Sequence, residues 1–451
     1  MDDRRKQTLM QRTDTAHPLP SSYYEATVTR PALPRLGART EQAEVCIVGG
    51  GFAGLATALG LVERGLRDIV VLEAERVGFG ASGRNGGFVF GGYSLENAEL
   101  LRLLGERDAN ALYALTTAAV DLIRRRITRY DIDCDAVHAG IILADWFGRP
   151  ARLAALRETM REHFGVDWLP IGAIELRQRL KSERYHGGLL EPHGFHFHPL
   201  KYLLGLVRAL AAAGVRIYEG SPAVSIQHRK EGLRVDTPAG SVEAREVVIA
   251  AGGYSSGISR AVERAILPIA TYVVATEPLG ERLKTAMECA SAVYDTRFAF
   301  DYYRPLPDTR LLWGGRISVF ERSPRRIAQL LQRDMLRVYP QLSGVEIEYA
   351  WSGFMSYARH KMPQIGRTPD GIWHAIGFGG HGVAPTTVAG ELLAAAIANR
   401  EAMAPAFARF GLVPAYGRLG LAAAELHYLT KIGIDLAAEH IARLRMGRHA
   451  R

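Results

Sequence analysis

The segment from residue 44 to residue 73 constrains the fold of this chain more than any other. An apolar run at 45–48 leads into Gly49, Gly51 and Gly54 of a G-x-G-x-x-G pattern, and a helical pattern and a second apolar run follow. In such a turn the first glycine permits the tight bend, the second lets the backbone approach a pyrophosphate, and the third lets helix and strand pack closely. The pyrophosphate would rest on the N–H groups of the helix N-terminus, where the helix dipole favours negative charge. The segment therefore predicts a dinucleotide-binding unit.

Glu73 adds a second element to this prediction. It ends the second apolar run and lies 19 residues after Gly54, near the spacing of roughly 20 at which an acid hydrogen-bonds a ribose hydroxyl. The alternative for Gly49-Gly50-Gly51 is a plain glycine loop. Strand, helix, second strand and acid in one register favour nucleotide binding.

Length, charge and cysteines limit the class of protein. The 451 residues predict two or three domain-sized units. Of the net charge of +9, residues 1–40 and 431–451 carry +3 each, which leaves +3 for the rest and argues against a nucleic-acid partner. The three cysteines show no metal-type spacing, so we expect no metal site, no disulfide framework and a cytoplasmic location.

The rest of the chain repeats the transition from strand to glycine. The apolar run 247–251 precedes Gly252, the run 372–376 precedes Gly377, and the glycine-rich stretch 78–87 must be a loop. Three separated transitions predict an α/β fold with a Rossmann-like domain assembled from discontinuous segments, plus a β-sheet-rich α+β substrate domain. The predicted bounds are an extended N-terminal arm 1–40, a nucleotide-binding domain 41–95, 196–262 and 350–400, a substrate domain 96–195 and 263–349, and a C-terminal helical tail 401–451.

The two ends of the chain show no targeting or membrane-spanning pattern. The N-terminus is basic without an apolar run before a cleavage site, and no stretch of about 18 apolar residues occurs anywhere. Residues 419–445 form an amphipathic pattern with a basic end. We expect a helix that packs on the protein's own surface, with peripheral contact to a membrane surface as the alternative.

These features together resemble the FAD-dependent D-amino-acid-oxidase-like (DAO) superfamily, and within it the γ-glutamylputrescine oxidase branch. The matching pieces are residues 45–54, Glu73, the run 80–87, the strand end 248–253, Trp313-Gly314-Gly315, residues 362–366 and 377–383, and Ser22-Tyr23-Tyr24 in the arm. The resemblance covers about residues 20–400. It implies FAD as the cofactor, with its ring facing the substrate domain.

The resemblance also implies which residues hold FAD. One group would bind the ADP half, one would line the ribityl and flavin region, and a glycine turn that feeds a helix N-terminus would offer N–H donors to the reduced flavin. By position these residues are Gly49, Gly51, Phe52, Ala53, Gly54, Glu73, Ala74, Gly80, Ala81, Ser82, Arg84, Asn85, Gly86, Gly87, Val224, Ala251, Gly252, Gly379, Gly380, His381, Gly382 and Val383.

The predicted substrate pocket is aromatic and suits an aliphatic amine or its cation. Its candidate residues are Phe88, Tyr254, Tyr302, Tyr303, Arg304, Trp351 and His381, of which Tyr254, Tyr302, Arg304 and His381 are the predicted catalytic contacts. Core packing is the alternative for each aromatic residue. His381 would donate a hydrogen bond or line the pocket. The alternative is a structural histidine that is hydrogen-bonded to backbone, and we do not expect His381 to act as a base.

Departures from the family pattern refine the expected chemistry. Some relatives link FAD to a cysteine in the region of residues 351–363, and others to a histidine in the region of residues 80–87. This chain has no cysteine in the first region and no histidine in the second, so we expect non-covalent FAD. Relatives also bind a substrate carboxylate with a lysine and an arginine, where this chain has Val383-Ala384-Pro385 and Phe88-Val89-Phe90. An amine or a longer amino compound is therefore expected rather than a small amino acid.

The predicted reaction is oxidation of a C–N bond to an imine by hydride transfer to FAD, with reoxidation by O2. Oxygen-using relatives carry a lysine near Leu311-Leu312-Trp313, which this chain lacks, so a dehydrogenase with a quinone or protein acceptor stays open. An RNA-modifying or RNA-binding flavoprotein, and a non-catalytic FAD scaffold, are alternatives from other classes.

Overall fold

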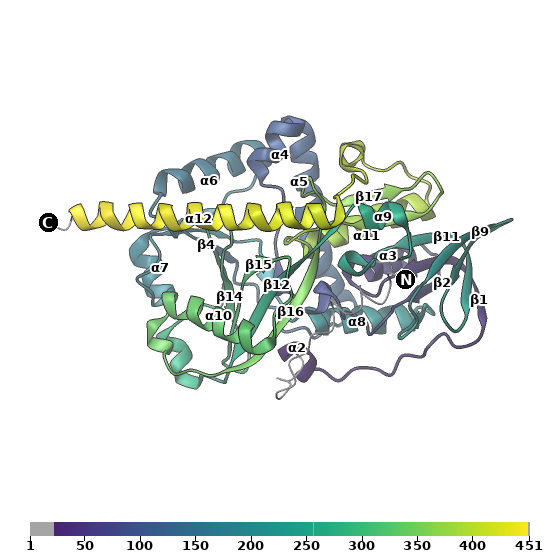
Figure 1. Cartoon of the computed structure of the whole chain (residues 1–451), viewed down its shortest axis with the longest axis horizontal. Helices are drawn as coiled ribbons and strands as arrows, with labels where there is room; N and C mark the ends of the chain where they lie inside the picture. Colours follow the sequence, from purple (N-terminus) through teal and green to yellow (C-terminus); the bar gives the residue numbers. More distant parts are fainter. Residues whose placement is uncertain (1–21, 256, 450–451) are drawn as a thin grey trace.

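The computed structural model of the chain describes residues 22–255 and 257–449, with side chains up to Ala442. The chain forms two lobes, each built around an eight-stranded sheet, and the long helix α12 (Gly417–His449) runs along one of them (Figure 1). The predicted α/β fold with a Rossmann-like domain and a sheet-rich second domain is confirmed.

The first sheet holds the nucleotide-binding motif. Its strand order is β17-β18-β11-β1-β2-β8, and the β9–β10 hairpin extends it from β11. The strands are β1 (Thr40–Val48), β2 (Ile69–Leu72), β8 (Arg216–Tyr218), β9 (Ser225–Arg229), β10 (Gly232–Asp236), β11 (Ser241–Ile249), β17 (Gln364–Arg367) and β18 (Trp373–Ile376). β18, β11, β1, β2 and β8 pair in parallel. Their carboxyl ends therefore meet at one edge, where the chain enters Gly49, Glu73, Ala250 and Gly377.

Helices pack on one face of this sheet, where Val45, Ile47 and Val71 share a core with them, and the β9–β10 hairpin with one short helix covers the other face. Two of the helices start at the carboxyl edge of the sheet. The helices of this lobe are α3 (Phe52–Glu63), α5 (Glu106–Arg129), α8 (Pro199–Ala212), α9 (Arg260–Arg264) and α11 (Val383–Ala398). α3 and α11 pack on each other so closely that a Cβ on Gly390 would lie 2.6 Å from the carbonyl carbon of Ala56, and one on Gly60 would lie 2.8 Å from the Ala394 Cβ. Glycine at these positions therefore sets the spacing of the two helices.

We expect Gly390→Val to destabilise the fold by about 3 kcal/mol, because the new side chain would overlap the backbone of α3. Gly390→Ala should cost less, since it adds only the Cβ. Gly433→Val in α12 is the matched control, because a Cβ there meets no atom within 4 Å. Thermal unfolding of the three variants tests this, and a Gly390→Val protein as stable as the control would contradict it.

The second sheet forms the other lobe. Its order is β16-β12-β15-β14-β13-β4-β6-β5. The strands are β4 (Ile141–Ala144), β5 (Leu169–Ile171), β6 (Gly188–Glu191), β12 (Leu267–Thr276), β13 (Ala292–Asp295), β14 (Tyr302–Pro305), β15 (Leu311–Ser318) and β16 (Ile347–Tyr357), with helices α6 (Pro150–Phe164), α7 (Ala173–Leu180) and α10 (Pro324–Val338) around them. A separate two-stranded sheet pairs β3 (Phe88–Val89) with β7 (Phe195–His196).

Two features of this arrangement differ from the predicted domain bounds. The predicted boundary at residue 350 falls inside β16, which pairs along its length with β12 of the second sheet. α5 falls in the predicted substrate segment 96–195, yet it contacts the nucleotide-binding lobe. There Arg126 pairs with Glu63 of α3 at 2.7 Å and with Glu391 of α11 at 2.5 Å.

Short elements complete the chain between the sheets. They are α2 (Tyr23–Ala26), α4 (Asn97–Leu104) and the 3-10 turns at Ala81–Gly83, Gly252–Tyr254, Gly280–Thr285, Pro340–Leu342 and Pro405–Phe410. The predicted arm 1–40 is described from Ser22 onward; residues 1–21 lie outside the described part. Its Tyr24 hydroxyl donates to the Asn85 carbonyl at 2.8 Å, so the arm supports the glycine-rich loop.

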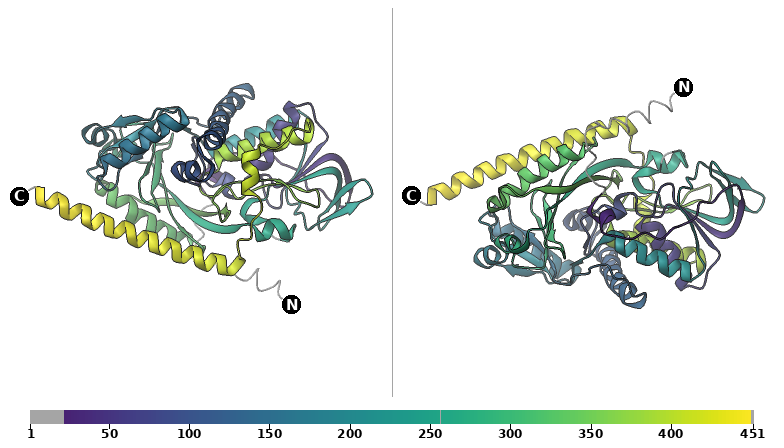
Figure 2. Two further views of the ribbon diagram at one scale, coloured as in Figure 1. Left: turned by 90° about the horizontal axis from the view of Figure 1, so that it is seen from above. Right: turned by 90° about the horizontal axis from the view of Figure 1, so that it is seen from below.

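α12 (Gly417–His449) confirms the predicted C-terminal helix and extends it. Both views of Figure 2 show it lying along one side of the body. Tyr428 and Glu439 on its inner face are buried, whereas Leu419, Leu426 and Leu436 are exposed. Packing on the protein's own surface therefore accounts for one face, and membrane contact through the other stays a prediction. In the described part of the chain, no helix combines the length and the apolar character needed to cross a membrane.

Candidate functional site

A cavity of about 1650 Å³ opens at the carboxyl edge of the first sheet and reaches the second sheet and α12. It brings together the two glycine turns that lie more than 300 residues apart in the chain. Most of the predicted cofactor residues line it: Gly49, Gly51, Phe52, Ala53, Glu73, Ala74, Gly80, Ala81, Ser82, Arg84, Asn85, Gly86, Ala251, Gly252, Gly379, Gly380, His381, Gly382 and Val383.

The first glycine turn leaves room where a nucleotide would lie. A Cβ on Gly49 would lie 2.6 Å from the Ala250 carbonyl oxygen, and a Cβ on Gly54 would overlap the Gly49 carbonyl. Only glycine allows β1, β11 and α3 to meet in this way. Gly54 lies outside the cavity lining, so its part is helix–strand packing, as the motif predicts.

Glu73 faces the same turn. Its carboxylate accepts the Gly50 N–H at 2.7 Å and the Glu75 N–H at 3.0 Å. Burial raises the pKa of Glu73, and the two backbone hydrogen bonds oppose that rise. An acceptor fixed beside the turn suits a ribose hydroxyl.

The glycine-rich loop is locked onto the start of α3. Ser82 Oγ accepts the Phe52 N–H at 2.9 Å, where the N-cap Gly51 offers no side chain. The Asn85 amide donates to the carbonyls of Ala81 and Ser82 at 3.0 and 2.8 Å. Backbone N–H groups, a serine hydroxyl and a helix N-terminus thus meet at one point, which suits a pyrophosphate.

The second glycine turn approaches the cavity from α11. Gly379 has φ +62°, and a Cβ there would overlap the Ser94 hydroxyl. Ser94 Oγ donates to the Phe378 carbonyl at 3.0 Å and accepts the His381 N–H at 3.1 Å. α11 then begins at Val383 without a side-chain cap. The turn therefore presents backbone N–H groups and a helix N-terminus to the cavity.

His381 lines the cavity and is also bonded to backbone. Its Nε2 lies 3.2 Å from the Phe90 carbonyl oxygen, so this nitrogen carries the proton, and its ring centroid lies 4.1 Å from that of Phe90. Burial lowers the pKa of His381 to about 4. The imidazole is therefore neutral near pH 7 and a weak base.

An aromatic wall faces the two turns. Ring contacts link its members in a row, with centroid separations from 5.6 to 6.3 Å. The row consists of Phe90, Tyr294, Phe300, Tyr302 and Phe88. Tyr302 fits between the loop and β15 because a Cβ on Gly86 would lie 2.6 Å from its ring. Tyr254 also lines the cavity but lies beside Phe79 on the nucleotide side.

Three predicted pocket residues do not line the cavity. The Arg304 guanidinium donates to the carbonyls of Gly86 and Phe197 at 2.7 and 2.9 Å, behind the loop. Tyr303 stacks on Trp313 in the core, because side chains alternate along β14 and Tyr302 takes the cavity side. Trp351 donates its Nε1–H to the Arg84 carbonyl at 2.9 Å.

Besides Gly54, two further predicted cofactor residues lie outside the lining, Val224 and Gly87. Val224 is half exposed and its N–H donates to the Asp236 carbonyl at 2.8 Å, so the neighbouring Ala223 lines the cavity instead. A Cβ on Gly87 would overlap the Phe197 carbonyl, which makes this glycine a packing requirement.

Sequence reasoning missed Ser94, which follows an unremarkable loop, and Glu191 in β6. The Glu191 carboxyl is buried behind the aromatic wall, and Oε1 accepts the N–H of Gly91, a lining residue, at 3.4 Å. Burial raises the pKa of Glu191 to about 8, so the group is mostly protonated at pH 7. Nothing in the short apolar sequence of β6 indicates that the acid at its end is buried and neutral.

Glu191 makes the stability of the protein pH-dependent. Its pKa in the folded state lies above the ordinary value of a glutamate side chain, so the stabilising contribution of the protonated carboxyl is present at pH 4.5 and is lost as the pH rises toward 8. We expect Glu191→Gln, which cannot ionise, to gain on the order of 3 kcal/mol relative to the native chain between pH 4.5 and 7.5. Urea unfolding at both pH values measures this, with the exposed Glu231→Gln as control. Parallel pH profiles for native and Glu191→Gln protein would contradict it.

The comparisons with known proteins agree with this geometry. Residues 44–396 match the family model described as DAO, FAD dependent oxidoreductase. The chain is 36% identical over 376 residues to gamma-glutamylputrescine oxidoreductase of Escherichia coli (strain K12). The aligned region covers 83% of this chain and 88% of that protein. The chain is likewise 36% identical over 363 residues to the probable oxidoreductase OrdL of Haemophilus influenzae, over 79% of this chain and 83% of that protein.

Solved structures support the fold. Glycine oxidase from Geobacillus kaustophilus superposes with a TM-score of 0.67 at 23% identity, over 83% of this chain and 99% of that chain. L-proline dehydrogenase from P. horikoshii superposes with a TM-score of 0.68 at 17% identity, over 83% of this chain and 100% of that chain. At these identities the likeness shows the shared fold.

Proposed function

We propose that this chain, which belongs to the DAO family of FAD-dependent oxidoreductases, oxidises a C–N bond of an elongated amine, of the γ-glutamylputrescine type, to an imine. The observation that carries the proposal is the chamber, the part of the cavity between the second glycine turn and the aromatic wall, which is lined by Phe88, Phe90, Tyr294, Phe300 and Tyr302. The identity to the Escherichia coli gamma-glutamylputrescine oxidoreductase supports the substrate class.

Family membership makes FAD the cofactor, and the residues of the cavity fit it. The glycines, Glu73, Ser82 and the α3 N-terminus would hold the ADP half, and the turn at 379–382 would face the flavin pyrimidine edge. Cys46, Cys134 and Cys289 all lie outside the lining, which agrees with non-covalent attachment.

The chain's own groups would position the amine and keep it uncharged. When bound, FAD supplies a two-electron acceptor that takes a hydride from the carbon bearing the nitrogen, which leaves an imine for water to hydrolyse. Tyr302, Phe300 and Phe88 would hold the aliphatic part by apolar contact. The burial that lowers the pKa of His381 also disfavours an ammonium ion, so it favours the neutral amine that can release hydride.

A side-chain clamp for an α-carboxylate is missing where relatives have one. Val383 and Ala384 open α11 and line the cavity, and Phe88 and Phe90 stand at the loop position. An apolar surface here favours amines over small amino acids, because a carboxylate would lose its hydration without gaining a partner.

Anaerobic bleaching of the bound flavin tests the proposal. We expect γ-glutamylputrescine to bleach the yellow colour at lower concentration than putrescine, and glycine, sarcosine and D-alanine to bleach it at least tenfold more slowly. Equal or faster reduction by the small amino acids would contradict the proposed substrate class.

Readmission of air to the reduced protein identifies the acceptor. We propose reoxidation by O2, with two electrons and two protons leaving as hydrogen peroxide. Rapid recovery of the yellow colour with stoichiometric peroxide is expected. Recovery that needs an added quinone would replace the oxidase by a dehydrogenase.

A further inference from the structure

α12 is a wall of the cavity, although it lies beyond residues 44–396 that match the family. Five residues of α12, spaced at helical intervals, line the cavity: Gly420, Ala423, Ala424, His427 and Tyr428. Tyr428 is buried, whereas Ala423 and His427 are also exposed to solvent. The outward leucines do not line the cavity. A segment outside the family's common fold therefore shapes the chamber in which the family's chemistry takes place.

α12 lies within one layer of side chains of the second glycine turn. Tyr428 is buried in a small apolar cluster with Met355 and Ile269, against which Tyr357 packs. Met355 and Tyr357 in turn adjoin Gly380, because a Cβ on Gly380 would lie 3.5 Å from the Met355 sulfur and 2.9 Å from the Tyr357 hydroxyl. The path from α12 to the turn that would face the flavin is thus continuous and short.

α12 also holds the loop that completes the aromatic wall. Residues 296–301 connect β13 to β14 and carry Phe298 and Phe300 into the cavity. The Phe298 N–H donates to Asp435 at 2.8 Å, and the Phe298 ring lies 5.5 Å from that of His427 and 6.0 Å from that of Tyr428. Backbone and ring of this loop residue therefore both rest on α12.

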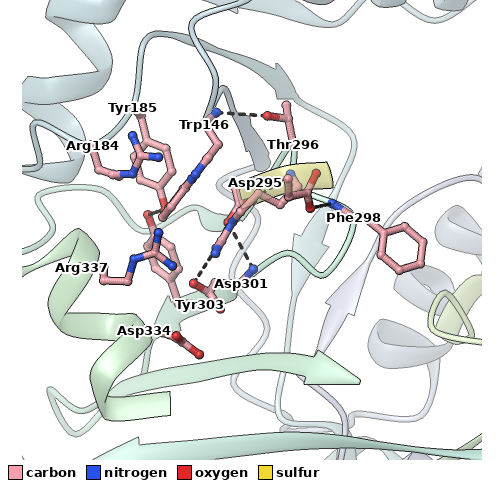
Figure 3. A network of polar contacts seen from close by, with 12 residues as sticks. Trp146, Arg184, Tyr185, Asp295, Thr296, Phe298, Asp301, Tyr303, Asp334 and Arg337 are labelled. Atoms are coloured by element: carbon pink, nitrogen blue, oxygen red, sulfur yellow. Dashed lines mark hydrogen bonds and ion pairs between the residues drawn. The ribbon is translucent and has the colours of Figure 1, made fainter. Parts of the chain in front are cut away.

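Glu439 of α12 belongs to a buried charge cluster around Trp146. Figure 3 shows other members of this cluster, among them Trp146, Arg184 and Arg337. Trp146 donates its Nε1–H to Glu439 at 3.2 Å, and Arg337 pairs with the same carboxylate at 2.8 Å. The Trp146 ring lies between the guanidinium groups of Arg184 and Arg297, 3.6 and 3.7 Å from its centroid. Cation–π contacts and a shared acid thus fix the helix to the second sheet.

The base of the 296–301 loop belongs to the same cluster. Arg297 pairs with Asp295 at 2.5 Å and with Asp301 at 2.6 Å, so it ties the two ends of the loop together. The Thr296 hydroxyl accepts the Trp146 backbone N–H at 3.0 Å. Helix, loop and sheet therefore form one rigid surface around the outer part of the chamber.

We propose that α12 is the outer wall of the substrate chamber and that His427 and Tyr428 are specificity-determining residues, which contact the part of the amine remote from the oxidised carbon. The proposal rests on the proposed amine oxidation and deepens it. The wall sets an upper limit on substrate length and favours an extended molecule, whereas a short amine would react without touching α12.

A chamber-filling substitution tests this with a matched control on the same helix. Ala424→Trp places a large ring in the cavity, and Ala422→Trp places the same ring on the exposed face, outside the lining. We expect Ala424→Trp to raise the Kd for γ-glutamylputrescine at least tenfold and the Kd for putrescine less than twofold. The anaerobic change in flavin absorbance and calorimetric titration with a non-reacting analogue measure binding without turnover.

His427→Ala removes a proposed contact with the long amine instead of filling the chamber, so it tests the same proposal by loss of a side chain. It should leave the limiting rate of flavin reduction unchanged and raise the Kd for the long amine threefold or more, with the short amine unaffected. Leu429→Ala on the exposed face is its control. Flavin content and thermal unfolding of each variant establish that it is folded.

The outcomes separate the two proposals. If native protein is bleached by amines but Ala424→Trp and His427→Ala bind long and short amines as the controls do, α12 has no part in specificity and this inference fails alone. If no amine bleaches the native flavin, the proposed function fails first. Equal weakening for long and short amines would also overturn the inference, because it would place α12 at the reacting end.

Discussion

The backbone contact between α3 and α11 is the constraint on which the rest of the site depends. Each helix starts at one of the glycine turns, and Gly390 lets the helices meet at Ala56 with no side chain between them. Their N-termini therefore point into the same cavity, where both helix dipoles favour negative charge. A wider spacing would move the two glycine turns apart.

A buried arginine secures this helix pair next to the glycine contact, because its partner Glu391 directly follows Gly390. Arg126 of α5 is almost fully buried and pairs with Glu63 and Glu391, one acid on each helix. A buried cation is stable only with such partners, and the pairing fixes which helices can neighbour α5. The nucleotide-binding lobe thus combines close backbone packing with a specific charge arrangement beside it.

A second arginine joins the two lobes at the glycine-rich loop. Arg304 of β14 donates to the carbonyls of Gly86 and Phe197, and contacts the Tyr24 hydroxyl at 3.2 Å. The N-terminal arm, the loop and the second sheet therefore meet at one guanidinium. Arg304 lies behind the loop, and Tyr302, two residues earlier on the same strand, lies against the cavity. The short strand β14 thus supplies both a residue that lines the cavity, Tyr302, and a residue that holds the loop in place, Arg304.

The sequence by itself determined the parts of the site whose cause is local. Gly49, Gly51, Gly54 and Glu73 could be assigned because the turn, the close approach and the spacing are properties of adjacent residues, and the glycine turn at 379–382 for the same reason. The sequence also indicated the family, the cofactor and the C-terminal helix. Only the tertiary structure decided which side of β14 faces the cavity, that Ser94 holds the second turn, that Glu191 is buried, and that α12 lines the cavity. These depend on which surfaces meet across hundreds of residues, and neither strand alternation nor helix periodicity says against what a face will pack.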